Sequence, residues 1–349
     1  MMTASMGLML TRRAFLTSGA ATFAAAACAR GRPSTRKERG LDSAVLAQAL
    51  NHVATEGKDL HSLLILRDDQ LVSETYWPPY ERNKKHALNS CTKPVVSALT
   101  GIASDDGALR EDDAVLRYFP DEAPANPDDA KKAITIKHLL TMSSGISWPQ
   151  HGPDNISDQM GRSPDWVKFI LDRPMAAAPG TVTNYSNGDS HLLSAIIGKV
   201  TQSTALDFAR ERLFGPLGIS DVRWDSDPQG RSIGSAALQL RPLDMTKLGR
   251  LYLASGAWNG RRILSADWVQ KSFTAHTQMP TAGGAADYGY YWWLYPQRKL
   301  FEAWGGAGQR IGVFPELGVV VVMTGAIGDD VPRSPFVAKL YDYVLQATE

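Results

Sequence analysis

The 349-residue sequence contains few cysteines and no recognisable metal-binding pattern. Its two cysteines, Cys28 and Cys91, are too few to form a disulfide framework in a chain of this length. The seven histidines are scattered, and none of them belongs to an HExxH motif or to a paired Cys/His spacing. We therefore expect neither a metal ion nor another cofactor.

An excess of charge of one sign is also missing. The 37 basic residues are balanced by 36 acidic ones, which gives a formal net charge of +1. A short basic run extends from Arg30 to Arg39 and precedes a globular pattern. It predicts a solvated linker over residues 29–40 and no nucleic-acid partner, and contact with anionic lipid is the alternative interpretation of this run.

Long apolar runs are absent as well. Thr11-Arg12-Arg13-Ala14-Phe15-Leu16 opens an apolar stretch of about 15 residues, which is shorter than the roughly 20 that a membrane-spanning helix needs. A basic start before a short apolar segment is typical of an export signal, and the adjacent arginines resemble a twin-arginine signal. We therefore predict an export signal over residues 1–28 and a periplasmic protein.

The end of this segment resembles a bacterial lipoprotein cleavage site. The residues are Ala25-Ala26-Ala27-Cys28, and cleavage before Cys28 would leave that cysteine as a lipidated first residue. A lipidated Cys28 would tether the mature protein to a membrane. Ordinary signal cleavage that removes Cys28 is the alternative.

The rest of the chain has the composition of a globular protein, with 44% hydrophobic and 21% charged residues. Hydrophobic periodicity predicts helices over residues 41–56, 92–105, 134–142, 165–171, 190–200, 205–213, 243–253 and 336–345. Runs of β-branched and aromatic residues predict strands over residues 62–66, 71–76, 288–294, 300–304, 311–314 and 319–324.

Strands therefore occupy both ends of the chain, and helices fill its middle. Short turns between neighbouring strands predict an antiparallel sheet, with helices on its faces. We expect an α/β (α+β) fold over residues 41–349. Its sheet part covers about 41–89 and 283–349, and its mostly helical part covers about 90–282.

Ser90-Cys91-Thr92-Lys93 is an S-x-x-K motif at the start of a predicted helix. Residues three apart on a helix share one face, so the lysine can lie beside the serine hydroxyl. A partly desolvated lysine can act as the base that activates a serine nucleophile. The same spacing recurs at Ser34 to Lys37, but there it falls in the basic linker, where no pocket is expected.

Two further motifs are suited to the same chemistry. Tyr185-Ser186-Asn187 is the only Y-x-N motif of the chain, and a phenol beside a lysine can move a proton between nucleophile and leaving group. Trp304-Gly305-Gly306-Ala307-Gly308 follows a predicted strand, where glycines allow close approach of a backbone or a ligand. Taken alone, the tyrosine could be structural and the glycines could form a simple turn.

Together and in this order, the three motifs resemble the serine β-lactamase and penicillin-binding-protein superfamily. The likeness is greatest to its class C-like branch, which includes esterases and 6-aminohexanoate-dimer hydrolase. Supporting stretches lie at residues 136–146, 179–189 and 243–260. The resemblance implies a β-lactamase/transpeptidase-like fold and a small ester or amide as substrate.

The resemblance also implies roles for individual residues. Ser90 would be the acylated nucleophile, and Lys93 and Tyr185 the proton-transfer pair. Asn187 would orient the lysine and the substrate. The oxyanion hole would combine the N–H groups of Ser90 and Ala307, with Gly306 as a rival for the second donor.

The sequence departs from the superfamily pattern at Trp304. β-Lactamases and carboxypeptidases usually carry lysine or histidine there, which helps to hold the substrate carboxylate, and a neutral indole cannot supply that charge. This favours a carboxylesterase or a 6-aminohexanoate-dimer-type amidase, with a class C β-lactamase or D-alanyl-D-alanine carboxypeptidase as the alternative. Trp148 is a further candidate for the cleft wall, or a core residue.

Two other interpretations compete with this one. Gly230-Arg231-Ser232-Ile233-Gly234 matches the G-x-S-x-G nucleophile elbow, but a turn-rich segment precedes it where the elbow needs a strand. The chain could also be a penicillin-binding or sensor module that acylates once without turnover. The complete set of Ser90, Lys93 and Tyr185 argues against such a module.

Overall fold

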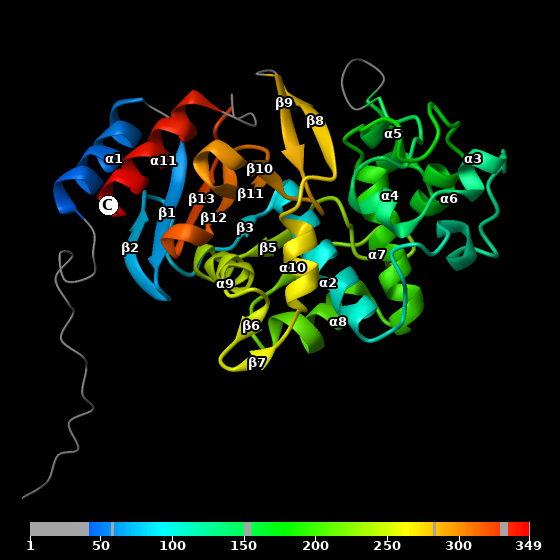
Figure 1. Ribbon diagram of the computed structural model, residues 1–349, viewed down its shortest axis with the longest axis horizontal. Coiled ribbons are helices and arrows are strands. Elements are labelled where there is room, and N and C mark those ends of the chain that lie inside the picture. The colour runs from blue at the N-terminus through cyan, green and yellow to red at the C-terminus, as the bar shows by residue number, and fades with distance from the viewer. Residues whose placement is uncertain (1–41, 57–58, 150–154, 282–283, 329–333, 349) are drawn as a thin grey trace, which may run out of the picture. The chain divides into compact units, whose positions relative to one another are not determined.

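A computed structural model describes residues 42–56, 59–149, 155–281, 284–328 and 334–348 of the chain. The predicted export signal, the linker and Cys28 lie outside these residues. Within them, eight strands form one antiparallel sheet in the order β2-β1-β13-β12-β11-β10-β9-β8 (Figure 1). The strands are β1 (Leu60–Arg67), β2 (Gln70–Tyr76), β8 (Thr277–Thr281), β9 (Gly284–Tyr288), β10 (Trp293–Tyr295), β11 (Leu300–Gly305), β12 (Gln309–Phe314) and β13 (Val319–Gly325).

The strands nearest the two ends of the described chain, β1 and β13, are neighbours close to the β2 edge of this sheet. β1 pairs with β13, with Leu64 opposite Val322. Every residue of β13 is buried, because both faces of the strand are covered. Side chains alternate between the faces of a strand, so Val319, Val321 and Met323 join one core and Val320 and Val322 the other. The predicted sheet built from both chain ends is confirmed.

Helices cover both faces of the sheet. α1 (Ser43–Thr55) and α11 (Pro335–Thr348) lie side by side on one face, where blue and red ribbons meet in Figure 1. The Asp42 carboxylate begins α1 by accepting the Ala44 and Val45 N–H groups. α9 (Pro242–Leu253) packs on the other face, where Gly249 allows close approach because a Cβ there would lie 2.5 Å from Val320.

The middle of the chain is mostly helical, as expected. Its largest helices are α2 and α7, which pack against each other. Besides α9, the α-helices of this region are α2 (Thr92–Asp105), α3 (Asp129–Lys132), α4 (Ile136–Leu140), α5 (Ile156–Arg162), α6 (Trp166–Leu171), α7 (Asn187–Thr201), α8 (Ala205–Ala209) and α10 (Ala266–Ser272). A π-helical turn, η3 (Arg210–Phe214), continues α8, and 3-10 turns are η1 (Asn89–Cys91), η2 (Val115–Tyr118), η4 (Pro296–Arg298) and η5 (Pro315–Leu317).

Short strands complete the region. β3 (His86–Ala87), β5 (Leu238–Leu240) and β4 (Arg223–Trp224) form a small sheet in that order. β6 (Ala257–Trp258) and β7 (Arg261–Arg262) form a separate hairpin. The pairing of β3 with β5 brings residues just before Ser90 next to the end of the segment that joins β4 to β5.

The predicted strand over residues 288–294 is wrong in one respect. The chain ends β9 at Tyr288 and begins β10 at Trp293, and the four residues between them form a turn in which Tyr291 has φ of +69°. All of these aromatic residues are buried, so hydrophobicity gave no sign of the turn. Gly289 allows it, because a Cβ there would lie 2.0 Å from the Ser272 carbonyl oxygen.

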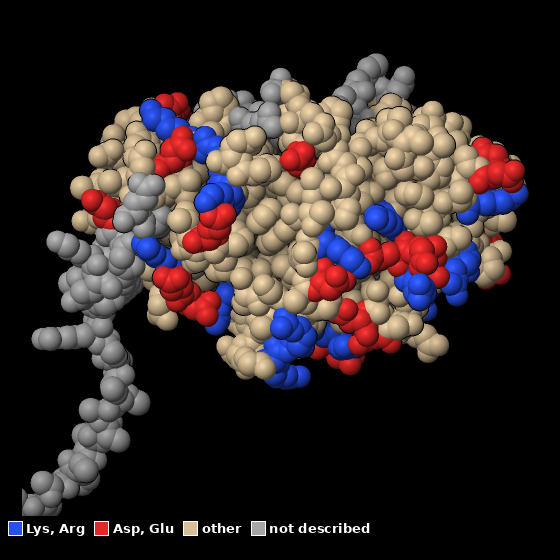
Figure 2. Space-filling model, in the orientation of Figure 1, with Lys and Arg blue, Asp and Glu red and all other residues tan. Residues whose placement is uncertain are grey.

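The edge strand β8 was not predicted. The C-terminal part of the sheet therefore begins at Thr277 and not near residue 283. Its sequence contains a proline, which a sheet edge tolerates. In the described part of the chain, no helix combines the length and the apolar character needed to cross a membrane. On the face drawn in Figure 2, basic side chains lie beside acidic ones.

Candidate active site

Ser90 lies in η1, the 3-10 turn that leads directly into α2. The helix covers the predicted residues 92–105, and it places Lys93 one turn after the serine. Asn89 has φ of +47°, a conformation that asparagine tolerates better than most residues. Its side-chain amide donates to the Gly306 carbonyl at 2.7 Å. On the other side of Ser90, the Cys91 thiol donates to the Gln309 carbonyl at 3.3 Å, so both neighbours tie the turn to the β11–β12 hairpin.

The Lys93 amine is buried beside the serine hydroxyl. Its side chain is 1% exposed, and Nζ lies 3.0 Å from Ser90 Oγ. Nζ also donates to Asn187 Oδ1 at 2.8 Å and to the Ser235 carbonyl at 2.9 Å. These three partners are neutral, and burial lowers the pKa of Lys93 to about 7. A substantial fraction of the lysine is therefore neutral near pH 7 and able to accept the serine proton.

Tyr185 lies just before α7 and approaches both groups. Lys93 Nζ is 4.8 Å from the centroid of its ring. Burial raises the pKa of the Tyr185 phenol above its usual value, an effect that a hydrogen bond with Ser90 only partly opposes. Tyr185 is therefore protonated at neutral pH, which suits a group that donates a proton and leaves the role of base to Lys93.

Asn187 is the first residue of α7, because the Ser186 hydroxyl caps this helix by accepting the Asp189 N–H. The predicted helix over residues 190–200 therefore begins earlier than expected. A protonated lysine only donates hydrogen bonds, so the amide oxygen of Asn187 must face Lys93. Its amide nitrogen donates to Ser157 Oγ on α5 at 3.0 Å. Ser157 was not predicted, because a lone serine after a loop carries no motif.

The end of β11 lies against the turn that carries Ser90. A Cβ on Gly305 would be 2.3 Å from the Leu88 carbonyl oxygen and 3.1 Å from the Ser90 nitrogen. The glycine is thus needed for contact between two backbones, and this contact places the Gly306–Ala307 peptide beside the serine. The Gly306 carbonyl is held by Asn89, as described above.

The peptide after Ala307 is fixed as well. Ala307 has φ of +66°, and its carbonyl accepts the Gln309 side-chain amide at 3.0 Å and the Ile327 N–H at 3.2 Å. The backbone around both rival oxyanion donors, Gly306 and Ala307, is therefore preorganised by the residues around it. Such preorganisation is what allows N–H groups to stabilise a developing oxyanion.

Trp304 occupies the head of the strand motif and belongs to an aromatic wall. Its ring meets Trp293 edge to face, with centroids 5.9 Å apart. Trp293 in turn stacks on Tyr185 at 6.2 Å. The guanidinium of Arg310 lies 5.9 Å from the centroid of the Trp304 ring, and this buried side chain is paired with Glu302 at 2.8 Å.

A buried carboxyl lies beneath the site. Asp189 is fully buried on α7, and burial raises its pKa to about 7. Its Oδ1 accepts the Ser144 hydroxyl at 2.9 Å. Among the described residues, its Oδ2 has no hydrogen-bond partner. At neutral pH this carboxyl is therefore only partly ionised, whereas an ordinary aspartate is fully ionised.

Two other sequence candidates lie outside the site. Ser232 sits in a loop that leads to strand β5, not to a helix, and its buried hydroxyl accepts the Leu206 N–H at 3.1 Å. The nucleophile-elbow interpretation is therefore wrong. Trp148 is 1% exposed and packs on Gly188, where a Cβ would approach the indole to 2.7 Å, so it belongs to the core.

Among the described residues, no group of three or more His, Cys, Asp or Glu side chains could hold a metal ion. Residues 54–330, more than half of the chain, match the model of the Beta-lactamase family, and the chain belongs to this family. The fold is therefore that of the β-lactamases and transpeptidases, as the sequence motifs implied. The particular class C-like branch stays a prediction.

The relatives of the chain include esterases and a 6-aminohexanoate-dimer hydrolase. It is 28% identical to esterase EstB from Burkholderia gladioli over 187 residues, which cover 50% of this chain and 46% of EstB. It is 21% identical to 6-aminohexanoate-dimer hydrolase from Paenarthrobacter ureafaciens over 299 residues, which cover 79% of this chain and 74% of that one. The match spans less than half of the length of EstB and of several other similar curated proteins.

Solved structures have the same fold at low sequence identity. EstCE1, a hydrolase with promiscuous acyltransferase activity, superimposes with a TM-score of 0.74 at 17% identity, over 86% of this chain and 98% of that one. A family VIII carboxylesterase superimposes with a TM-score of 0.72 at 14% identity, over 87% of this chain and 97% of that one.

Proposed function

We propose that this protein is a serine hydrolase that cleaves an ester or an uncharged amide through an acyl-enzyme on Ser90. The observation that carries this proposal is the position of Lys93, whose buried amine lies 3.0 Å from Ser90 Oγ and has its pKa lowered to about 7 by burial. A base whose pKa is near the working pH is partly deprotonated, and it is still basic enough to take the proton of the serine hydroxyl.

Acylation follows from the roles of these groups. Neutral Lys93 takes the Ser90 proton while Oγ bonds to the substrate carbonyl carbon, and the N–H groups of Ser90 and Ala307 stabilise the oxyanion. The Tyr185 phenol then gives its proton to the leaving oxygen or nitrogen and regains one from Lys93. The alcohol or amine departs, the acyl group stays on Ser90, and Lys93 is neutral again.

Deacylation runs through the same groups in reverse. Water attacks the acyl carbon and loses its proton to Tyr185, which passes its own proton toward Lys93. The tetrahedral intermediate collapses, the carboxylic acid leaves, and Lys93 returns the proton to Ser90 Oγ. We assign activation of the attacking water to the Tyr185–Lys93 pair, because these two residues account for every proton transfer of deacylation without a separate glutamate.

The aromatic wall supports an uncharged acyl group. Trp293 meets Trp304 edge to face and stacks on Tyr185, and none of the three carries a positive charge that could form an ion pair with a carboxylate. This favours a carboxylesterase or an amidase of the 6-aminohexanoate-dimer type, in line with the names of the relatives. A class C β-lactamase or D-alanyl-D-alanine carboxypeptidase is the second candidate, favoured by the family to which the chain belongs.

The test compares three substrates with the mature protein: a short-chain p-nitrophenyl ester, a chromogenic cephalosporin and the linear 6-aminohexanoate dimer. Turnover of the ester or the dimer without the cephalosporin supports the proposal. Fast cephalosporin turnover would identify the second candidate and contradict the argument from Trp304. Ser90→Ala should abolish turnover, because no acyl-enzyme can form, and stoichiometric labelling without steady-state product would instead indicate a binding module.

We also propose that the protein is exported to the periplasm and anchored through Cys28. Support comes from the sequence of residues 1–28, with its twin arginines and its Ala-Ala-Ala-Cys run. Metabolic labelling with a palmitate analogue should mark the wild-type protein and not Cys28→Ala. Unlabelled wild-type protein whose mature N-terminus lies beyond residue 28 would contradict lipidation while leaving export intact.

A further inference from the structure

The third partner of Lys93 lies outside every motif of the active site. It is the carbonyl of Ser235, which accepts from Nζ at 2.9 Å. Ser235 belongs to the segment between β4 and β5, far from the catalytic motifs in sequence. A backbone carbonyl can hold the lysine only if its segment is itself fixed, so the residues that fix it contribute to the site.

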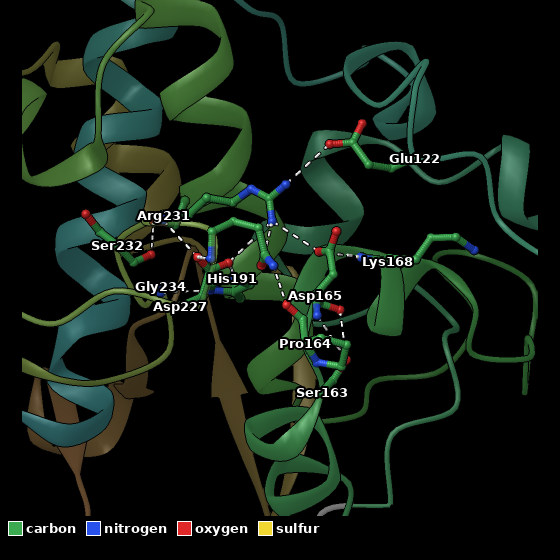
Figure 3. A network of polar contacts seen from close by, with 12 residues as sticks. Glu122, Ser163, Pro164, Asp165, Lys168, His191, Asp227, Arg231, Ser232 and Gly234 are labelled. Carbon is green, nitrogen blue, oxygen red and sulfur yellow. Dashed lines mark hydrogen bonds and ion pairs between the residues drawn. The ribbon is translucent and has the colours of Figure 1, made fainter.

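A buried histidine on α7 contacts this segment directly. The Gly234 N–H donates to His191 Nδ1 at 3.4 Å. Because Nδ1 accepts a hydrogen bond, the proton of the neutral ring is on Nε2, which donates to Asp227 Oδ2 at 3.1 Å. Both side chains are completely buried, and Figure 3 draws them at the centre of a polar network.

Asp227 closes the loop from which this segment extends. Its Oδ1 accepts the N–H groups of Gln229 and Arg231 at 2.9 and 2.8 Å. The Arg231 guanidinium lies 3.4 Å from Asp227 Oδ2 and reaches Asp165 and Glu122 on its other sides (Figure 3). The charged groups around His191 are therefore Asp227 and, behind it, Arg231 with its two acidic partners. The remaining ring neighbour, Trp166, is neutral.

Two further contacts press the segment onto α7. The Ser194 hydroxyl donates to the Ser232 carbonyl at 2.7 Å. A Cβ on Gly234 would lie 2.1 Å from the Ser190 carbonyl oxygen, so the two backbones touch. The segment therefore has little freedom, and the carbonyl of Ser235 follows the position of α7.

We propose that His191 is a positioning residue of the active site, which with Asp227 holds the Gly234–Ser235 segment against α7 so that the Ser235 carbonyl contacts and covers the Lys93 amine. His191 follows Asn187 by about one helical turn, and both serve the same amine. Asn187 contacts Nζ directly, and His191 acts through the backbone. This inference rests on the proposed function of Ser90 and Lys93.

The consequence concerns the ionisation of Lys93. Burial is the main cause of its lowered pKa, and the Ser235 segment forms part of that cover. If the segment loosens, water reaches the amine and stabilises its charged form, so the pKa rises toward the usual lysine value. The lysine is then less often neutral at low pH, and acylation of Ser90 slows there.

The experiment measures covalent labelling of Ser90 by a p-nitrophenyl alkylphosphonate from pH 5 to 9 in the full-length protein. Labelling needs the nucleophile and its base but no turnover. One variant is His191→Leu, which removes the hydrogen bonds of the ring with Asp227 and with the Gly234 N–H. The other is Ser194→Ala, which removes only the hydrogen bond from the Ser194 hydroxyl to the Ser232 carbonyl. His191→Gln is the conservative variant, because its amide keeps a donor and an acceptor. Thr201→Val is the matched control, since it deletes a side-chain hydrogen bond at the far end of the same helix.

We expect the midpoint of labelling to rise by about one pH unit in His191→Leu, which is about a tenfold slower reaction below both midpoints. Ser194→Ala should shift the midpoint less in the same direction, and His191→Gln should restore most of the wild-type profile. Thr201→Val should lower the melting temperature without moving the midpoint. If His191→Leu does not fold, the pH profile of labelling in Ser194→Ala tests the inference in its place.

An unchanged midpoint in the folded variants, or a shift to lower pH, would overturn the inference even if the labelling rate falls. The same holds if Thr201→Val moves the midpoint as much as His191→Leu. Wild-type protein that labels at Ser90 but turns over no ester or amide would overturn the proposed function alone. Wild-type protein that does not label at Ser90 would overturn both.

Discussion

Gly305 and Gly306 are adjacent, yet substitution by alanine should be harmful at Gly305 and nearly neutral at Gly306. At Gly305, the new Cβ would lie 2.3 Å from the Leu88 carbonyl oxygen, where ordinary contact begins at 3.4 Å. The obstacle is backbone, so β11 and the turn that carries Ser90 must separate by about 1 Å. A misplacement of about 1 Å at a reacting group costs roughly 10²-fold in rate. Overpacking of this kind also costs about 1–3 kcal/mol of stability.

Gly306→Ala is the matched control. No atom lies within 4 Å of a Cβ at this position, and the backbone N–H is kept. Steady-state kcat/KM for a p-nitrophenyl ester and the melting temperature should be measured for both variants. We expect Gly305→Ala to lose about two orders of magnitude in kcat/KM and Gly306→Ala to stay near wild type. Equal effects of the two substitutions would refute the packing argument, as would wild-type activity in Gly305→Ala.

Two further predictions concern pH. Because burial lowers the pKa of Lys93 to about 7, kcat/KM should rise with pH through about 7 and then level, and a midpoint near 10 would contradict Lys93 as a buried base. Asp189 retains its proton to about pH 7 in the folded protein and loses it near pH 3.8 in the unfolded chain. The free energy of unfolding should therefore fall as the pH rises from 3.8 to about 7, by on the order of 4 kcal/mol. Above pH 7 it should stay level. Denaturant titrations of wild type and Asp189→Asn should show this slope only in the wild type, and the same slope in both would assign it to other groups.

The elements next to the site were predicted well from the sequence, because their patterns are local. The apolar face of residues 92–105 and the S-x-x-K spacing together fix where Lys93 lies relative to Ser90, since both depend only on helical geometry. The strands at the two chain ends were found from their β-branched residues, and their burial on both faces agrees with their composition. Predictions failed at the turn after Tyr288 and at edge strand β8, where uniform burial or a proline obscures the period.

The sequence by itself determined the fold class, the three motifs and the neutral residue at the head of the last one, because each is a property of neighbouring residues. Only the tertiary structure decided which distant groups complete the site. Ser157 on α5 and the Ser235 carbonyl approach it from separate segments, and no spacing in the sequence relates them to Ser90. The lowered pKa of Lys93 likewise depends on burial by these segments, because desolvation is set by everything packed around the amine and not by the residues beside it in the chain.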